Sequence, residues 1–154
     1  MRETPITVLV AEDDEEDRML VREAWERNRL ANELRFVGDG DELMAYLLRR
    51  GAYADPATSP RPDLVLLDCD MPTRDGPSAL AELKASPTLC RVPVVVLTAS
   101  DDEDRIRRCY ELGANSYVVK PFTFSKLAQT LRVLGDYWFE IVTLPGGSEE
   151  AMLQ

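Results

Sequence analysis

The most informative stretch of this sequence is a run of large aliphatic residues, 64–67, that ends in Asp68. A continuous apolar run lying between Pro62 and Pro72 is typical of a strand that is buried on both faces. In open parallel sheets, ligands bind just beyond the carboxyl ends of such strands. Asp68 is therefore the first candidate for a functional side chain.

Three other apolar runs end in residues that can do chemistry. Residues 6–11 run into Glu12 and Asp13, residues 94–97 run into Thr98, and residues 117–119 run into Lys120. If these runs are parallel strands of one sheet, their carboxyl ends lie at one edge. We expect three carboxylates, a hydroxyl and an ammonium to meet there.

Glu12, Asp13 and Asp68 would form an acidic cluster that needs a cation. Carboxylates a few ångströms apart repel one another and raise each other's pKa, so the cluster is costly unless a positive charge neutralises it. Oxygen ligands suit Mg²⁺, which takes one or two carboxylates and keeps several waters. The alternative is that each acid caps a helix or faces water, and we favour that interpretation for Asp14, which is placed as a natural N-cap.

Asp68 is also a candidate nucleophile toward phosphorus, which would give an aspartyl phosphate. Such a step needs charge neutralisation more than acid–base chemistry. Mg²⁺ would join Asp13, Asp68, the backbone carbonyl of Asp70 and one phosphoryl oxygen. Lys120 and the Thr98 hydroxyl would bind the other two oxygens. Pro121 could hold a cis peptide that aims Lys120, although few X-Pro bonds are cis.

Strands that alternate with helices predict an α/β domain whose parallel sheet is covered on both faces. We expect helices after Asp14 and after Asp39, one with Pro77 in its first turn, one from Asp101 to Leu112, and one that starts near Thr123. Residues 1–140 form one domain in this interpretation, and residues 141–154 form a short, partly flexible extension with no output domain. The loop from Gly51 to Pro62 is expected to be a mobile insertion.

Apolar residues at helical spacing predict the inward faces of three helices. The expected core positions are Leu20, Val21, Ala24 and Trp25 in the first helix, Leu43, Met44, Leu47 and Leu48 in the second, and Phe124, Leu127, Leu131, Leu134 and Trp138 in the last.

Composition excludes several functions. The formal net charge of -10 argues against nucleic-acid binding, which needs a basic patch. No apolar run is long enough to span a membrane and no signal-peptide core is present, so we expect a cytoplasmic protein. The chain contains no histidine (His 0), so it cannot form a Ser-His-Asp catalytic triad and cannot itself be a phosphohistidine donor. Its three cysteines lack metal-motif spacing, so reduced thiols are expected.

Taken together, these motifs resemble the receiver domain of two-component response regulators, as in the CheY-like single-domain proteins. The resemblance covers roughly residues 7–138. Its motifs are the acidic pair after the first strand, Leu66-Leu67-Asp68-Cys69-Asp70-Met71-Pro72 with Asp75-Gly76, Val96-Leu97-Thr98-Ala99, and Tyr117-Val118-Val119-Lys120-Pro121-Phe122.

The resemblance implies a flavodoxin-like, doubly wound sheet with the strand order 2-1-3-4-5. It also implies that Asp68 is the phosphoacceptor, that Glu12, Asp13 and Asp68 serve the metal, and that Lys120 binds phosphate. Thr98 and Tyr117 would be the switch residues, while Asp70 and Ser100 fall where the family tunes dephosphorylation. The protein would be no enzyme beyond Mg²⁺-dependent self-phosphorylation and autodephosphorylation.

The C-terminal stretch 136–145 and the insertion at 51–62 look similar to response regulators that serve phytochrome-type light-sensing kinases. The partner implied is a sensor histidine kinase, with a bacteriophytochrome as the first candidate. In those regulators the face of helix four, strand five and helix five pairs two molecules. Here we expect a homodimer that also uses Tyr137, Phe139 and the tail.

Two other functions remain open at this stage. Asp68-Cys69-Asp70 resembles the nucleophile motif of haloacid-dehalogenase-type phosphatases, although a strand with its own acid pair precedes it and Pro72 replaces the usual threonine. A phosphorylation-independent adaptor would leave the acidic cluster unexplained.

Overall fold

The computed structural model describes residues 6–28, 33–71 and 75–141, giving the backbone alone for residues 139–141. Within these residues the five strands form one parallel sheet in the order β2-β1-β3-β4-β5. The strands are β1 (Thr7–Ala11), β2 (Glu33–Val37), β3 (Leu64–Leu67), β4 (Val94–Thr98) and β5 (Ser116–Val119). The predicted fold class and strand order are therefore confirmed.

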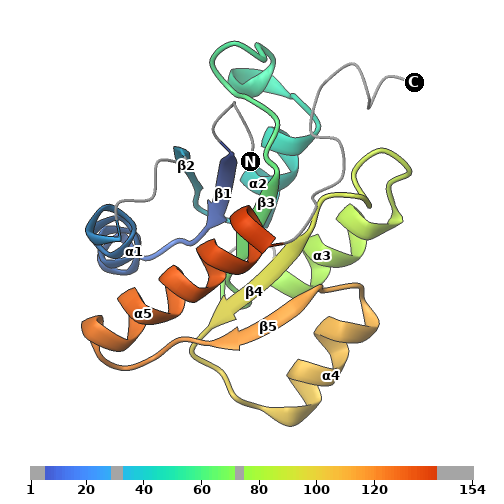
Figure 1. Ribbon diagram of the computed structural model, residues 1–154. Helices are drawn as coiled ribbons and strands as arrows, with labels where there is room; N and C mark the ends of the chain where they lie inside the picture. The colour runs from blue at the N-terminus through green and yellow to red at the C-terminus, as the bar shows by residue number, and fades with distance from the viewer. Residues whose placement is uncertain (1–5, 29–32, 72–74, 142–154) are drawn as a thin grey trace.

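Five α-helices cover this sheet on two faces (Figure 1). They are α1 (Glu15–Arg27), α2 (Gly40–Leu47), α3 (Gly76–Ala85), α4 (Glu103–Glu111) and α5 (Phe124–Gly135). Aspartates cap four of them: Asp14 accepts backbone N–H bonds at the start of α1, and Asp39, Asp75 and Asp102 do so for α2, α3 and α4. The predicted role of Asp14 is confirmed.

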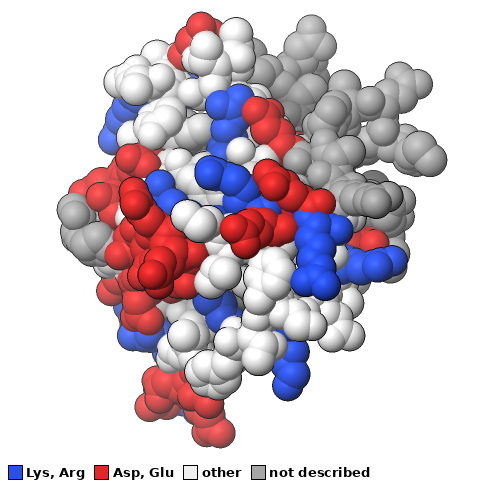
Figure 2. Space-filling view, turned by 90° about the vertical axis from the view of Figure 1, so that its left-hand side faces the viewer, with Lys and Arg blue, Asp and Glu red and all other residues white. Residues whose placement is uncertain are grey.

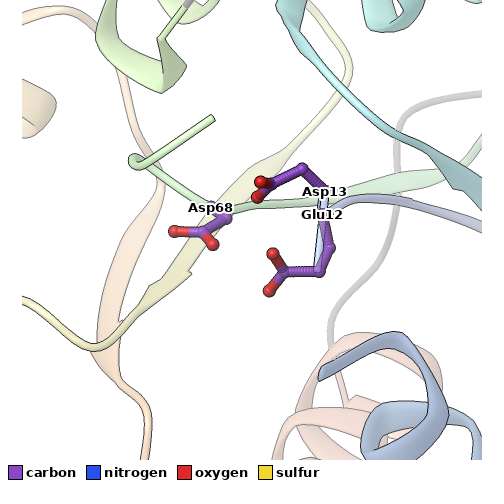
Figure 3. Close-up of side chains that lie close together, drawn as sticks. All are labelled: Glu12, Asp13 and Asp68. Carbon is purple, nitrogen blue, oxygen red and sulfur yellow. The ribbon is translucent and has the colours of Figure 1, made fainter. Parts of the chain in front are cut away.

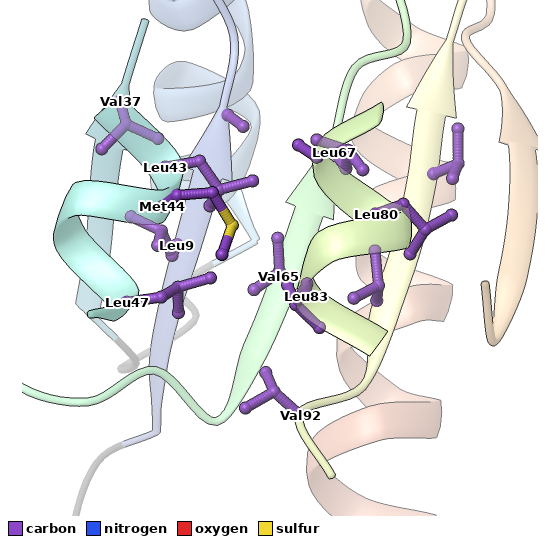
Figure 4. Packing of buried hydrophobic residues seen from close by; sticks show 14 of the residues in the cluster. Leu9, Val37, Leu43, Met44, Leu47, Val65, Leu67, Leu80, Leu83 and Val92 are labelled. Atoms are coloured by element: carbon purple, nitrogen blue, oxygen red, sulfur yellow. The ribbon is translucent and has the colours of Figure 1, made fainter. Parts of the chain in front are cut away.

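The core consists of two apolar clusters, one on each face of the sheet. The first lies between the sheet and α2 and α3 and includes Leu9, Leu43, Val65, Leu80 and Leu83 (Figure 4). The second lies under α1 and α5, where Val21, Trp25, Leu127, Leu131 and Trp138 meet β1, β3 and β4. Both faces of β3 are thus buried, which explains why its sequence is apolar without interruption.

Two expected core positions are wrong. Leu20 and Leu48 are 38% and 36% exposed, because each lies at the margin of the apolar stripe of its helix. Helical spacing predicts where a stripe runs but not how wide the neighbouring sheet and helices make it.

The chain between Gly51 and Pro62 has structure of its own. It contains a 3₁₀ turn, η1 (Gly51–Tyr53), and the Tyr46 hydroxyl of α2 donates a hydrogen bond of 2.7 Å to the carbonyl of Pro60. The rings of Tyr46 and Tyr53 also pack, with centroids 5.0 Å apart. The insertion is therefore fastened to α2.

After α5 the backbone continues as a π-helical segment, η2 (Asp136–Ile141), which spacing did not predict. The Trp138 side chain of this segment is 7% exposed and belongs to the core, as expected. The predicted extension at 142–154 lies outside the described residues. No helix in the described part of the chain is both long and apolar enough to cross a membrane.

Candidate functional site

The register of the sheet brings the predicted site residues to one edge. Ala11 lies opposite Leu67, so Glu12 and Asp68 follow at the same level, and the Asp68 N–H donates a 3.0 Å hydrogen bond to the carbonyl of Ala11. Thr98 lies opposite Val119, so Lys120 follows beside the end of β4. The Lys120 N–H donates to the carbonyl of Thr98 at 2.8 Å.

Glu12, Asp13 and Asp68 form the acidic cluster that the sequence predicts. One carboxylate oxygen from each lies within 4.8 Å of the others, and the three side chains point to the same space (Figure 3). Glu12 and Asp68 are 2% and 9% exposed, whereas Asp13 faces solvent.

Lys120 contacts the cluster from β5. Its ammonium pairs with the Glu12 carboxylate and lies 3.7 Å from Asp68 Oδ2. It also forms a 3.2 Å ion pair with Asp17, in the first turn of α1. Lys120 is therefore shared among three acids. The peptide bonds of the described residues are all trans, including the one before Pro121, so the idea of a cis bond there is wrong.

Burial and charge shift the pKa values of the two central groups. Burial is the main reason that the pKa of Glu12 is raised from 4.5 to about 7, although the hydrogen bond and charge of Lys120 oppose this shift. Burial would lower the pKa of Lys120, but the Glu12 hydrogen bond and the nearby carboxylates outweigh it, so the pKa of Lys120 is raised. Lys120 is therefore a fixed positive charge at the site.

Thr98 ends β4 and Tyr117 lies on the neighbouring strand β5, and their role as switch residues stays a prediction. The Thr98 side chain is fully buried, and its hydroxyl has no hydrogen-bond partner among the described residues. A buried hydroxyl without a partner is costly, and a ligand oxygen at the site would remove that cost. The Tyr117 hydroxyl donates a 2.8 Å hydrogen bond to the carbonyl of Ser100, which ties β5 to the loop after β4.

Asp70 is close to Asp68, but its carboxylate points away from the acidic cluster. Its N–H donates to Asp68 Oδ1 at 3.1 Å, while its carboxylate forms a 2.8 Å ion pair with Arg105 of α4. The side chain of Asp70 is thus directed to α4. The suggested role of its backbone carbonyl as a metal ligand stays a prediction.

Sequence reasoning missed three residues at this edge. Asp17 holds Lys120, Arg105 holds Asp70, and Arg18 Nε donates to the carbonyl of Glu12 at 2.6 Å. Asp17 and Lys120 are separated by 103 positions, and Asp70 and Arg105 by 35. No local sequence pattern predicts such partners, because they depend on how α1 and α4 lie against the sheet.

The donor set fits a divalent cation. Three carboxylates at one point provide only oxygen ligands, which hard cations prefer. Acidic side chains also gather in patches on this side of the molecule, with basic ones between them (Figure 2). The cluster therefore supports divalent metal binding.

The fold and this edge define a receiver domain. The family model described as "Response regulator receiver domain" matches residues 8–132, and the chain belongs to that family. It is therefore a response regulator of two-component signalling, whose partner is a sensor kinase.

Individual relatives show which response regulators this chain is similar to. The chain is 40% identical over 141 residues to "Response regulator Rcp1" of Synechocystis sp., covering 92% of this chain and 94% of that protein. A structure of the phosphorylated cyanobacterial phytochrome response regulator RcpA is 40% identical, covers 93% of this chain and 100% of its own, and has a TM-score of 0.86.

A second similar structure is that of the Mn²⁺-bound form of response regulator Rcp1. It has a TM-score of 0.83 and 40% identity, and the match covers 92% of this chain and 100% of that one. The chain is thus similar to phytochrome response regulators along nearly its whole length. These relatives give no support to the phosphatase alternative.

Proposed function

We propose that Asp68 accepts a phosphoryl group from a phosphohistidine of the sensor kinase. The observation that carries this proposal is the position of its carboxylate, which shares a space with Glu12 and Asp13 and lies 3.7 Å from the ammonium of Lys120. The chain has no histidine, so the donor belongs to another protein.

In the transfer, a carboxylate oxygen of Asp68 bonds to phosphorus, and the bond between phosphorus and the donor imidazole breaks. Lys120 exchanges part of its contact with Glu12 and Asp17 for a phosphoryl oxygen, and the Thr98 hydroxyl takes another. Glu12, Asp13, Asp68 and the Asp70 carbonyl would hold Mg²⁺, which supplies positive charge against the phosphoryl oxygens. We expect slow self-phosphorylation from small phosphodonors and slow autodephosphorylation at the same site.

A change at Thr98 would reach the surface through Tyr117. Thr98 and Tyr117 lie on neighbouring strands, and the Tyr117 hydroxyl is bonded to the loop that leads to α4. We propose that phosphorylation alters the face made by α4, β5 and α5. Each of these elements exposes a large apolar residue, Tyr110, Val119 and Val133 respectively, and Tyr137 follows α5. We propose that this face pairs two copies of the chain.

The similarity to phytochrome regulators supports a light-sensing kinase, such as a bacteriophytochrome, as the partner. Phosphotransfer from such a kinase should be faster than from unrelated sensor kinases. A cytoplasmic location is supported by the three cysteines, which are free thiols, as expected in a reducing compartment.

The assignment of Asp68 is tested with Asp68→Asn. The unmodified chain with acetyl phosphate and Mg²⁺ should gain one hydroxylamine-sensitive phosphoryl group, measured by intact mass, and the variant should gain none. Asp70→Asn is the matched control and should still be modified, because the Asp70 carboxylate faces Arg105. Equal incorporation by Asp68→Asn would place the acceptor at another residue, and no incorporation by the natural chain would favour the phosphorylation-independent adaptor.

The metal assignment is tested with a neighbouring pair of acids. Mn²⁺ binding followed by electron paramagnetic resonance, with Mg²⁺ as competitor, should weaken at least about tenfold in Asp13→Asn, which removes one charged ligand. Asp14→Asn should bind normally, because asparagine also serves as an N-cap and Asp14 points into α1. Equal losses in both variants would indicate a general charge effect instead of a ligand role.

A further inference from the structure

α4 is attached to the core through very little buried surface. Cys109 is its one buried residue, and the rest of the helix is exposed or half-buried. The first turn of α4 borders a cleft of about 520 Å³, and residues of α3 line its other side. The position of α4 therefore depends on a few specific contacts.

Two of these contacts reach the residues directly after Asp68. Cys69 Sγ lies 3.6 Å from Cys109 Sγ, and the Asp70 carboxylate pairs with Arg105 at 2.8 Å. Arg105 and Cys109 are four positions apart and so lie on one face of the helix. α4 is thus held at two adjacent points to the loop that follows the phosphoacceptor.

The two sulfurs are placed for a covalent bond. Their separation of 3.6 Å is close contact, but it exceeds a disulfide bond of about 2.05 Å by roughly 1.5 Å, so the side chains must turn toward each other before the bond forms. Cys69 and Cys109 are 40 positions apart, so a bond between them would close a long loop. Cys90, the third cysteine, is exposed on a turn, outside this pair.

We propose that Cys69 and Cys109 are an oxidisable pair, which a hydroperoxide converts to an intramolecular disulfide that fixes α4 to the loop after Asp68. In molecules where α4 has opened, one thiol loses its proton and the thiolate sulfur takes an oxygen from hydrogen peroxide as the O–O bond breaks; the leaving hydroxide takes up the proton, giving a sulfenic acid and water. The other thiol sulfur then displaces that oxygen: the S–S bond forms, the S–O bond breaks, and a second water leaves. Two thiol hydrogens and one peroxide give one disulfide and two waters.

Burial decides when this reaction can occur. The two side chains are 2% and 0% exposed, so peroxide reaches them only in molecules where α4 has opened. Oxidation of the pair is therefore slower than oxidation of Cys90. Simple core packing of two thiols is the competing explanation, and it predicts that no cross-link forms.

The first test maps the thiols of the full chain. The chain is treated with hydrogen peroxide, alkylated, digested and analysed by mass spectrometry, with Cys90→Ser as the matched variant because it keeps both buried cysteines. Both proteins should yield a peptide pair linked through Cys69 and Cys109, lighter by two hydrogens and separated again by dithiothreitol. Cys109→Ala should lose the link. The proposal is overturned if the buried pair is recovered as thiols or as sulfinic and sulfonic acids, or if the linked cysteine is Cys90.

The second test measures what the bond does to α4. Amide hydrogen exchange across residues 103–111 should slow at least severalfold in oxidised Cys90→Ser, while exchange in α2 stays the same. Unchanged exchange in α4, with the disulfide present, would contradict the claim that the bond fixes the helix. Neither test requires phosphorylation, so the inference stands or falls separately from the role of Asp68.

Discussion

Glu12 shows how a single residue at this site combines opposing effects. Its carboxyl is almost fully buried, which favours the neutral form, yet it pairs with Lys120, which favours the charged form. Burial wins, so the pKa of Glu12 rises to about 7. The metal-free protein therefore holds a proton at Glu12 in a pH range where the unfolded chain does not.

This shift predicts how stability depends on pH. Between pH 4.5 and about 7 the native state binds more protons than the unfolded state. The contribution of Glu12 is thus fully present below pH 4.5, and it is lost as pH rises through about 7. The loss of this contribution lowers the free energy of unfolding by about 3 kcal/mol at most. Replacing Glu12 by glutamine removes the titration, so the free energy of unfolding of Glu12→Gln relative to the natural chain should rise from pH 5 to pH 8.

Urea denaturation without divalent metal, at a series of pH values, measures this difference. Glu16→Gln removes a carboxylate from the exposed first turn of α1 and is the control for the loss of an acidic side chain at a solvent-exposed position. If the curves of Glu12→Gln and the natural chain run parallel over that range, the carboxyl of Glu12 titrates at its ordinary pKa and the argument fails.

Gly76 shows how one element constrains the site in another. It is the first residue of α3, and its N–H donates to the carbonyl of Cys69 at 3.0 Å. A Cβ there would lie 2.6 Å from the backbone oxygen of Asp68 and 2.7 Å from the Cα of Cys69. The start of α3 can approach the loop at Asp68 and Cys69 this closely only because residue 76 has no side chain.

Gly76→Ala should therefore displace either α3 or the loop at Asp68. We expect a loss of about 1–3 kcal/mol in the free energy of unfolding and weaker binding of Mn²⁺. Gly38→Ala is the control: its Cβ would meet only the end of the flexible Arg18 side chain, at 3.0 Å, so the metal affinity should change little. Denaturation and Mn²⁺ titration of both variants measure these two effects. A Gly76→Ala protein with normal metal affinity would contradict the proposed strain on the loop.

The elements and the strand-end residues could be predicted from the sequence because the information is local. Buried parallel strands need uninterrupted apolar runs, and the residue that ends each run must lie at the sheet edge. That logic located Asp13, Asp68, Thr98 and Lys120. The strand order itself came from the family resemblance, since periodicity does not contain it.

The contacts that tie helices to this edge could not be predicted in the same way. The ion pairs of Asp17 with Lys120 and of Asp70 with Arg105, and the approach of Cys69 to Cys109, depend on the rotation and height of α1 and α4 against the sheet. A helical pattern fixes neither quantity. The exposed positions of Leu20 and Leu48 are errors of the same origin.

At the scale of the whole molecule, the distribution of exposed apolar residues supports the proposal that two copies pair through α4, β5 and α5. Val133 and Tyr137 are 60% and 48% exposed and lie one helical turn apart. Tyr110 and Val119 are also exposed, on α4 and β5. Large apolar side chains on three neighbouring elements are typical of an interaction surface.

Val133→Glu should separate the proposed dimer into monomers. A carboxylate at the centre of an apolar interface loses its hydration without gaining a partner, so we expect the dimer to dissociate at least about tenfold more readily. Met19→Glu is the matched control, because Met19 is exposed to a similar degree but lies on α1. Analytical ultracentrifugation over a range of concentrations, with and without acetyl phosphate and Mg²⁺, measures both variants. If Met19→Glu makes the dimer dissociate as readily as Val133→Glu does, or if Val133→Glu leaves the dimer unchanged, the face of α4, β5 and α5 does not pair two copies.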